Sequence, residues 1–226
     1  MQTDLSTHDG ATRRLRPETQ RLLAWAGIVG PVLFTLCFVA QELARRGDFS
    51  TLEEPVSALE AGPHGWVQQA NFLVFAALTI AHAVGLHLGM RSSRGGIVGP
   101  ALLALTAVGG IVAAAIPFRE DAFGVAYAPA GHVVGGMIFF LGSPAALIAL
   151  CFRMRRDPRW SGLATYTLAS GIALIVAAVL TITLVIPDDA PLHDWAGLVQ
   201  RLTVVVVLFP CRVAIGVRLL RVASER

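Results

Sequence analysis

The sequence contains no lysine, and charged residues of both signs make up only 15% of its 226 residues. Charged residues normally make up about a quarter of a soluble domain, so the composition excludes an ordinary soluble protein. All 18 basic side chains are arginines, and they are scattered along the chain rather than gathered into a stripe. Because nucleic-acid binding needs a clustered basic surface, we expect no nucleic-acid partner.

Cysteine is also scarce: Cys37, Cys151 and Cys211 are the only three, and each lies in a long apolar run. An odd number of dispersed cysteines indicates neither a disulfide framework nor a cysteine-based zinc site. The sequence also lacks a dense metal-ligand spacing such as His-Glu-X-X-His. We therefore expect no metal site, and the sequence indicates no particular cofactor.

Long apolar runs dominate the chain, which is 55% hydrophobic with a mean hydropathy of +0.66. A helix that crosses the roughly 30 Å apolar core of a bilayer needs about 20 such residues. The sequence predicts an all-α polytopic membrane protein with six transmembrane helices in three antiparallel hairpins, forming a domain over residues 22–222 after a flexible cytoplasmic tail, residues 1–21. The predicted spans are residues 22–43, 67–89, 97–118, 131–152, 163–186 and 195–217.

The arginines are distributed unequally between the two sides of these spans. Thirteen lie in the two termini and in the second and fourth connections, whereas Arg45, Arg46 and Arg119 lie in the first and third. Short loops rich in arginine stay in the cytoplasm. We therefore expect a multi-pass protein of the cell membrane with both termini cytoplasmic.

The connection after the first span is the longest outer loop, and it carries signals for a helix of its own. Ser50 and Glu53 have the spacing of a capping box, and Leu52, Val56 and Leu59 follow at helical intervals. This pattern predicts a short interfacial helix on the outer leaflet.

Two arginines fall inside the last predicted span. Arg201 lies six residues after Trp195, about 9 Å along a helix. Because a charge at this depth is costly, we expect a buried ion pair or an anion site for Arg201, with Glu42, Glu60 or Asp121 as the acid. Arg212 lies near the cytoplasmic end, where we expect its side chain to reach the phosphate headgroups.

Polar side chains gather at the outer ends of several spans. His132 and His193 are candidate catalytic bases, because histidine exchanges protons near neutral pH, and Asp121 or Glu60 is the expected partner. Arg201, Asn71 and His64 are candidate substrate-binding residues at the same level. Polar residues at helix ends are also commonly just hydrated, so this pattern leaves a purely structural role open.

These features together resemble a prokaryotic multi-pass membrane family, catalogued as domain of unknown function number 998. The likeness covers residues 22–222. The resemblance implies a six-helix plasma-membrane protein and assigns no reaction. This sequence departs from the family's usual pattern at Glu60, where a small residue is expected. The motifs that carry it are Val-Ser-Ala-Leu at 56–59, Gly62, Pro63, Asn71, Asp121, His132, His193 and Gly-Leu-Val-Gln-Arg at 197–201.

The sequence leaves three functions open. The first is a structural or accessory membrane protein whose outer polar layer ties the hairpins together. The second is an enzyme acting on a lipid or isoprenoid-type substrate at the outer leaflet through a His/Asp/Arg site. The third is a small carrier or channel, although no ionisable residue lies at the midplane of the predicted spans. The lipid bilayer is the one expected partner in all three, and the oligomeric state stays open.

The arginine distribution makes the orientation testable. A reporter that is active only in the cytoplasm should work when it is fused to either terminus. A thiol introduced into the loop of residues 153–159 should be inaccessible to an impermeant reagent in intact cells. Labelling of that loop from outside would contradict the orientation.

Overall fold

A computed structural model gives the structure of residues 16–62, 64–91, 93 and 95–225. Six helices in this part of the chain are long and apolar enough to cross a membrane, in agreement with the six apolar runs of the sequence. Five of them are α1 (Pro17–Ala44), α2 (Gly65–Gly89), α3 (Val98–Ala115), α4 (Ala130–Met154) and α5 (Ser161–Leu184). The sixth consists of η2 (His193–Trp195), α6 (Ala196–Arg201), η3 (Leu202–Leu208) and α7 (Phe209–Ser224).

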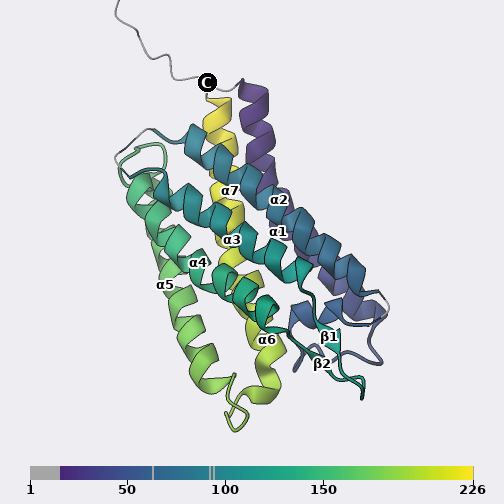
Figure 1. Ribbon diagram of the computed structural model, residues 1–226. Helices are drawn as coiled ribbons and strands as arrows, with labels where there is room; N and C mark the ends of the chain where they lie inside the picture. Colours follow the sequence, from purple (N-terminus) through teal and green to yellow (C-terminus); the bar gives the residue numbers. More distant parts are fainter. Residues whose placement is uncertain (1–15, 63, 92, 94, 226) are drawn as a thin grey trace, which may run out of the picture.

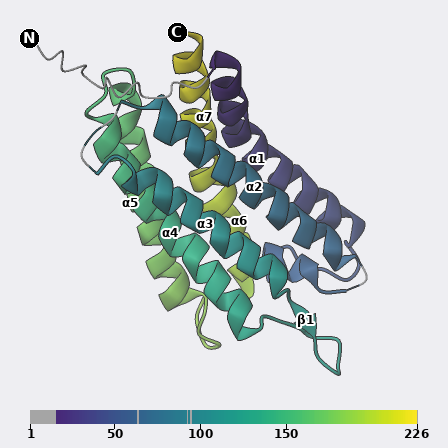
Figure 2. The same ribbon diagram turned by 45° about the horizontal axis from the view of Figure 1, so that its top comes forward.

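The helices form a bundle in which neighbours in sequence pack side by side from α1 to α5 (Figures 1 and 2). Helix α7 closes the bundle by packing against α1 and, more lightly, against α2 and α5. Helix α1 begins and α7 ends at the same end, called here the terminal end (Figure 1). The opposite end carries η1 (Val56–Glu60) and the small β1–β2 hairpin, and is called here the η1 end.

Prolines explain where helix α1 begins and where helix α3 ends. Helix α1 begins at Pro17, whose ring fixes a helical φ and whose missing N–H is not needed in the first turn. This start lies inside the predicted tail, of which residues 1–15 fall outside the described residues. Helix α3 ends at Ala115, three residues before the predicted end, because Ile116 precedes Pro117 and is forced out of the helical region.

The connections at the η1 end differ from the sequence prediction in two ways. A two-stranded antiparallel sheet, β1 (Arg119–Glu120) and β2 (Ala126–Tyr127), interrupts the all-α pattern. The expected interfacial helix is a 3₁₀ helix, η1, which begins after Pro55 and buries Val56, Ala58, Leu59 and Glu60 against the bundle instead of exposing them. Ser50 Oγ does accept the Glu53 N–H at 3.3 Å, as in a capping box, but the chain there forms only a turn.

The last span contains a π-helical segment, η3, over Leu202–Leu208. The N–H of Phe209 donates to the carbonyl of Val204, five residues earlier. The next residue, Pro210, has no N–H and its ring displaces the carbonyl four residues before it. The wider π turn therefore forms where proline prevents the regular hydrogen-bond pattern.

Helices α3 and α4 approach most closely at two glycines. A Cβ atom on Gly135 would lie 2.7 Å from the carbonyl oxygen of Gly109 and 2.8 Å from the amide nitrogen of Ala113. Both of these neighbours are backbone atoms, which cannot rotate away. A side chain at Gly135 would therefore push the two helices apart.

We expect Gly135→Ala to lower the melting temperature in detergent, because overpacking of this kind costs about 1–3 kcal/mol. Gly136→Ala is the matched control, since a Cβ atom there meets no atom within 4 Å. Equal melting temperatures for the two variants would contradict the close approach of α3 and α4.

Candidate functional site

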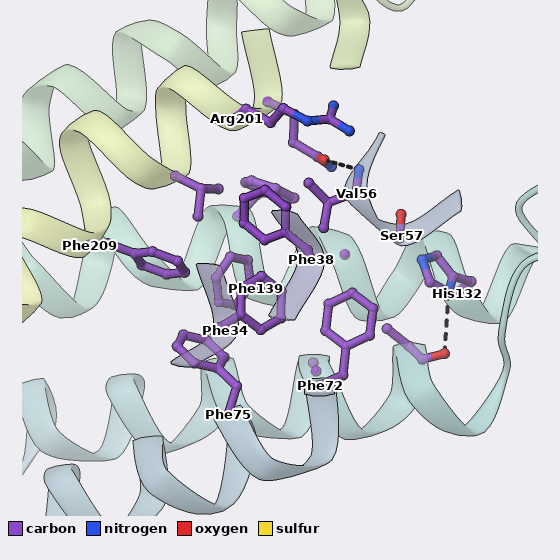
Figure 3. Close-up of a pocket in the computed structure, with 18 of the residues that line it drawn as sticks. Phe34, Phe38, Val56, Ser57, Phe72, Phe75, His132, Phe139, Arg201 and Phe209 are labelled. Atoms are coloured by element: carbon purple, nitrogen blue, oxygen red, sulfur yellow. Dashed lines mark hydrogen bonds between the residues drawn. The ribbon is translucent and has the colours of Figure 1, made fainter. Parts of the chain in front are cut away.

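A cavity of about 80 Å³ lies inside the bundle, toward the η1 end (Figure 3). Helices α1, α2, α3 and α4 contribute to its wall, together with α6, η3 and α7. Aromatic rings form most of the apolar wall, namely those of Phe34, Phe38, Phe72, Phe75, Phe139, Phe140 and Phe209. Its apolar, largely aromatic lining suits a hydrocarbon group rather than a charged molecule.

The phenylalanines share the cavity because of their spacing along the helices. Phe34 and Phe38 on α1 are four residues apart, and Phe72 and Phe75 on α2 are three apart, so each pair lies on one helix face. Ring centroids of Phe34 and Phe75 are 4.9 Å apart, in a tilted arrangement. Aromatic side chains from different helices thus meet across the bundle and stabilise the wall.

Polar side chains line the cavity at the η1 end: Ser57, His132, Gln200 and Arg201 (Figure 3). The loop that carries Ser57 is held over the cavity by hydrogen bonds to the last span. Gln200 Oε1 accepts the Val56 N–H at 2.8 Å, and the Gly197 N–H donates to the Glu53 carbonyl at 3.1 Å. Gly197 allows this contact, since a Cβ atom there would lie 2.3 Å from the Glu54 carbonyl oxygen.

His132 pairs with Glu60, one of its two expected partners. The distance from His132 Nδ1 to Glu60 Oε2 is 3.2 Å, and both side chains are buried. Nδ1 also lies 3.2 Å from the Ala113 carbonyl oxygen and 3.1 Å from that of Ile116. Because carbonyl oxygens only accept hydrogen bonds, Nδ1 carries a proton.

The other ring nitrogen of His132, Nε2, forms no hydrogen bond with any described residue. In a neutral imidazole with a proton on Nδ1, Nε2 holds a free lone pair and can accept a proton. The imidazole lies at the cavity wall, next to Ser57 in Figure 3. A carboxyl group on Nδ1 and a free Nε2 at a cavity is the arrangement of an oriented general base.

Glu60 can itself exchange a proton near neutral pH. Burial raises the pKa of its carboxyl group to about 7, and the hydrogen bond that Oε2 accepts from the Phe118 N–H opposes this rise only in part. The second oxygen, Oε1, is buried and has no partner among the described residues. The Glu60–His132 pair is therefore suited to holding and moving one proton.

Arg201 forms a buried ion pair with Glu42 of α1. Its Nε and Nη2 atoms lie 2.8 Å and 2.6 Å from Glu42 Oε1, and Nη1 donates to the Glu54 carbonyl at 2.8 Å. The two side chains are only 11% and 10% exposed. Of the two roles expected from the sequence, this contact is an ion pair, and Glu42 is the acid that supplies it.

The remaining predicted site residues lie elsewhere. Asn71 is buried, and its Nδ2 donates to the Phe34 carbonyl at 3.1 Å and to Gln68 Oε1 at 3.2 Å, which links α2 to α1. His193 is exposed, with Nδ1 3.1 Å from the Val185 carbonyl oxygen. Asp121 is exposed and accepts two backbone N–H groups in the β1–β2 turn. His64 is exposed just before α2. The structure thus brings His132 and Arg201 to the cavity, with Glu60 in contact with His132, whereas these four residues do not line it.

Ser57 and the phenylalanine wall were not recognised as site residues from the sequence. Ser57 lies three residues before Glu60 in η1, and side chains three apart nearly eclipse in a 3₁₀ helix. The spacing places Ser57 and Glu60 on one face of a 3₁₀ helix. The sequence, however, predicts an α-helix for this loop. The phenylalanines have the spacing of ordinary packing residues, and the sequence does not indicate which of them line a cavity.

The predicted position of Arg212 is wrong. Its side chain is 2% exposed and turns into the bundle instead of reaching the headgroups. Its Nη2 donates to Thr79 Oγ1 at 2.7 Å, and the guanidinium lies 4.7 Å from the centroid of the Phe75 ring. Because α7 packs against both α1 and α2, this face of the helix is internal, and a hydroxyl and an aromatic ring replace the phosphate as partners.

In the described part of the chain, no three His, Cys, Asp or Glu side chains are grouped closely enough to hold a metal ion. The fold and the cavity are consistent with a multi-pass membrane protein that has an internal apolar site.

The chain belongs to the family described as Protein of unknown function (DUF998), whose family model matches residues 28–214. This confirms the resemblance found in the sequence. No curated protein and no solved structure matches the chain.

We expect Arg201→Met to lower the stability in detergent by about 3 kcal/mol, because it leaves the Glu42 carboxylate buried without a partner. The double variant Glu42→Gln with Arg201→Met should recover part of this loss, since no unpaired charge remains. Arg119→Met is the control, because this arginine is exposed at the same end. A double variant no more stable than the single one would contradict the role of the ion pair.

Proposed function

We propose that this protein is an integral membrane enzyme that acts on a lipid or isoprenoid-type substrate. The substrate's apolar chain occupies the phenylalanine-lined cavity, and His132, oriented by Glu60, is the general base. One observation supports this most: the free Nε2 of His132 lies at the wall of an apolar cavity, while Nδ1 is fixed by Glu60 and two carbonyl groups.

In the proposed orientation, the protein lies in the plasma membrane with both termini in the cytoplasm. The η1 end then faces outward, and the cavity lies in the outer half of the bilayer. The helices then form three antiparallel hairpins. The unequal arginine distribution supports this arrangement, because thirteen arginines belong to the termini and the connections at the terminal end.

The chemistry of the site supports an ester or phosphoester as the reacting group. A hydroxyl group, from water or from an acceptor alcohol, attacks the carbonyl carbon or the phosphorus, and its proton passes to His132 Nε2. The bond to the leaving oxygen breaks, and the same proton returns to that oxygen. Glu60 stabilises the imidazolium through Nδ1 while it exists, and no further reactant is needed.

A structural role is the second candidate, and the contacts of Arg201 favour it. This arginine already pairs with Glu42 and the Glu54 carbonyl, and Gln200 already holds Val56. These contacts tie the last span to the first span and its loop. They account for Arg201 without a substrate, but they do not account for the free nitrogen of His132.

The experiment measures cleavage of labelled phosphatidylglycerol and farnesyl diphosphate by the protein in nanodiscs. We expect one of the two to be cleaved, and His132→Gln to reduce the rate about 100-fold or more with little change in melting temperature. Gly136→Leu should also abolish turnover by filling the cavity, whereas Val133→Leu, on the lipid-exposed face of α4, should not.

Two results would overturn the enzyme proposal. One is the absence of cleavage of both probes by the folded wild-type protein. The other is an unchanged rate in His132→Gln. A fall in melting temperature of His132→Gln as large as that of Arg201→Met would instead assign His132 to the structural role.

A further inference from the structure

A second cavity, of about 610 Å³, lies far from His132, at the terminal end between α5 and α7. The loop before α5 and its first turn provide one wall, with Arg159 and Leu163. The last turns of α7 provide the other, with Val217, Arg218 and Arg221. The cavity is called the α5–α7 groove below.

The groove is polar at one end and apolar at the other. Arg159 comes two residues before α5 begins, and Arg221 lies four residues before the end of the described chain, so both lie at the limit of the spans. Leu163 follows Arg159 by four residues and Val217 precedes Arg221 by four, so both lie about one turn further into the helices. In a membrane this places the guanidinium groups at the level of the lipid phosphates and the apolar side chains at the level of the acyl chains.

The positive charge of the groove is only partly neutralised within the chain. Asp157 accepts hydrogen bonds from Arg159 at 2.7 Å and 3.0 Å. Burial raises the pKa of its carboxyl group, but these bonds and two backbone N–H groups outweigh burial and lower the pKa to about 2. The Asp157 carboxylate is therefore ionised and already paired with Arg159.

The two arginines of α7 that line the groove, Arg218 and Arg221, are less well paired. Arg218 Nη1 lies 4.0 Å from an exposed Glu225 carboxylate, which is the limit of an ion pair. Its Nε donates to the Arg159 carbonyl, which orients the side chain along the groove. Arg221 is exposed and forms no ion pair with any described residue. An anion placed between these two side chains would meet an unbalanced positive charge.

The surroundings of the groove indicate the kind of anion. Helix α5 is the least buried of the six candidate spans. Its exposed face carries Ile172, Ile175, Val176 and Val179. In a membrane this face contacts acyl chains, so the molecules nearest the groove are phospholipids.

We propose that the α5–α7 groove is a binding site for an anionic glycerophospholipid, with its phosphate between Arg218 and Arg221 and an acyl chain along Leu163 and Val217. Basic pockets between spans, at the membrane surface, bind such headgroups. A lipid fits better than free phosphate because the apolar part of the groove contributes only if the ligand carries a chain. The site depends on insertion in a membrane and not on the proposed enzymatic function.

The test is native mass spectrometry of the detergent-solubilised protein titrated with dioleoyl phosphatidylglycerol or dioleoyl phosphatidylcholine. We expect tighter binding of the anionic lipid, and a weakening of about fivefold for Arg221→Gln, since each arginine near a headgroup contributes about that factor. Arg218→Gln with Arg221→Gln should remove the preference for the anionic lipid. The single variant is the cleaner one, because Arg221 holds no other described side chain in place.

Arg91→Gln with Arg155→Gln is the matched control, because both arginines are exposed near the same end but do not line the groove. Equal losses in the control and the groove variants would overturn the proposal, since general surface charge would then explain the preference. Equal binding of both lipids by the wild-type protein would also overturn it. Displacement of phosphatidylglycerol by millimolar inorganic phosphate would show an anion site without a lipid chain.

Discussion

The ion pair between Arg201 and Glu42 is the contact on which the η1 end of this protein depends. A guanidinium group at membrane depth must find a carboxylate, water or a lipid phosphate. Here the carboxylate comes from α1, and the same arginine also holds the Glu54 carbonyl. The first span, its following loop and the last span are thereby joined at one point. These contacts hold η1 against the bundle beside the cavity, and so bring Glu60 to His132.

The two acid–base pairs at this end differ in what they leave free. In the Arg201–Glu42 pair, three of the arginine nitrogens donate to protein oxygens, so the pair is largely satisfied and mainly stabilises the fold. In the His132–Glu60 pair, Nδ1 faces three oxygens, Glu60 Oε1 is buried without a partner among the described residues, and Nε2 forms no hydrogen bond with any of them. A neutral imidazole with its proton on Nδ1 can accept a second proton at Nε2. The first pair is thus satisfied within the protein, whereas the second keeps a nitrogen that can react.

The sequence predicted features that depend on composition and missed those that depend on which faces meet. The six spans followed from apolar length, and the need of Arg201 for an acid followed from its depth. The choice of Glu42 over Glu60 or Asp121 did not, because it depends on α1 packing against the last span. Arg212 shows the same limit, since its distance from the helix end favoured a headgroup contact, whereas the packing of α7 on α1 and α2 turned it toward Thr79 and Phe75. Hydropathy gives depth in the membrane but not rotation about the helix axis.

Pro210 shows how one residue can connect these observations. Proline removes a hydrogen bond from the last span, and the chain responds with the π turn of η3 at the level of the cavity. Val204 and Val205, adjacent residues of η3, both line the cavity, together with Phe209 just beyond it. The π turn and the start of α7 thus form the apolar wall that the last span contributes to the cavity, beyond the polar Gln200 and Arg201. Single π turns occur frequently at functional sites, so the break in this helix is itself an argument that the cavity is used.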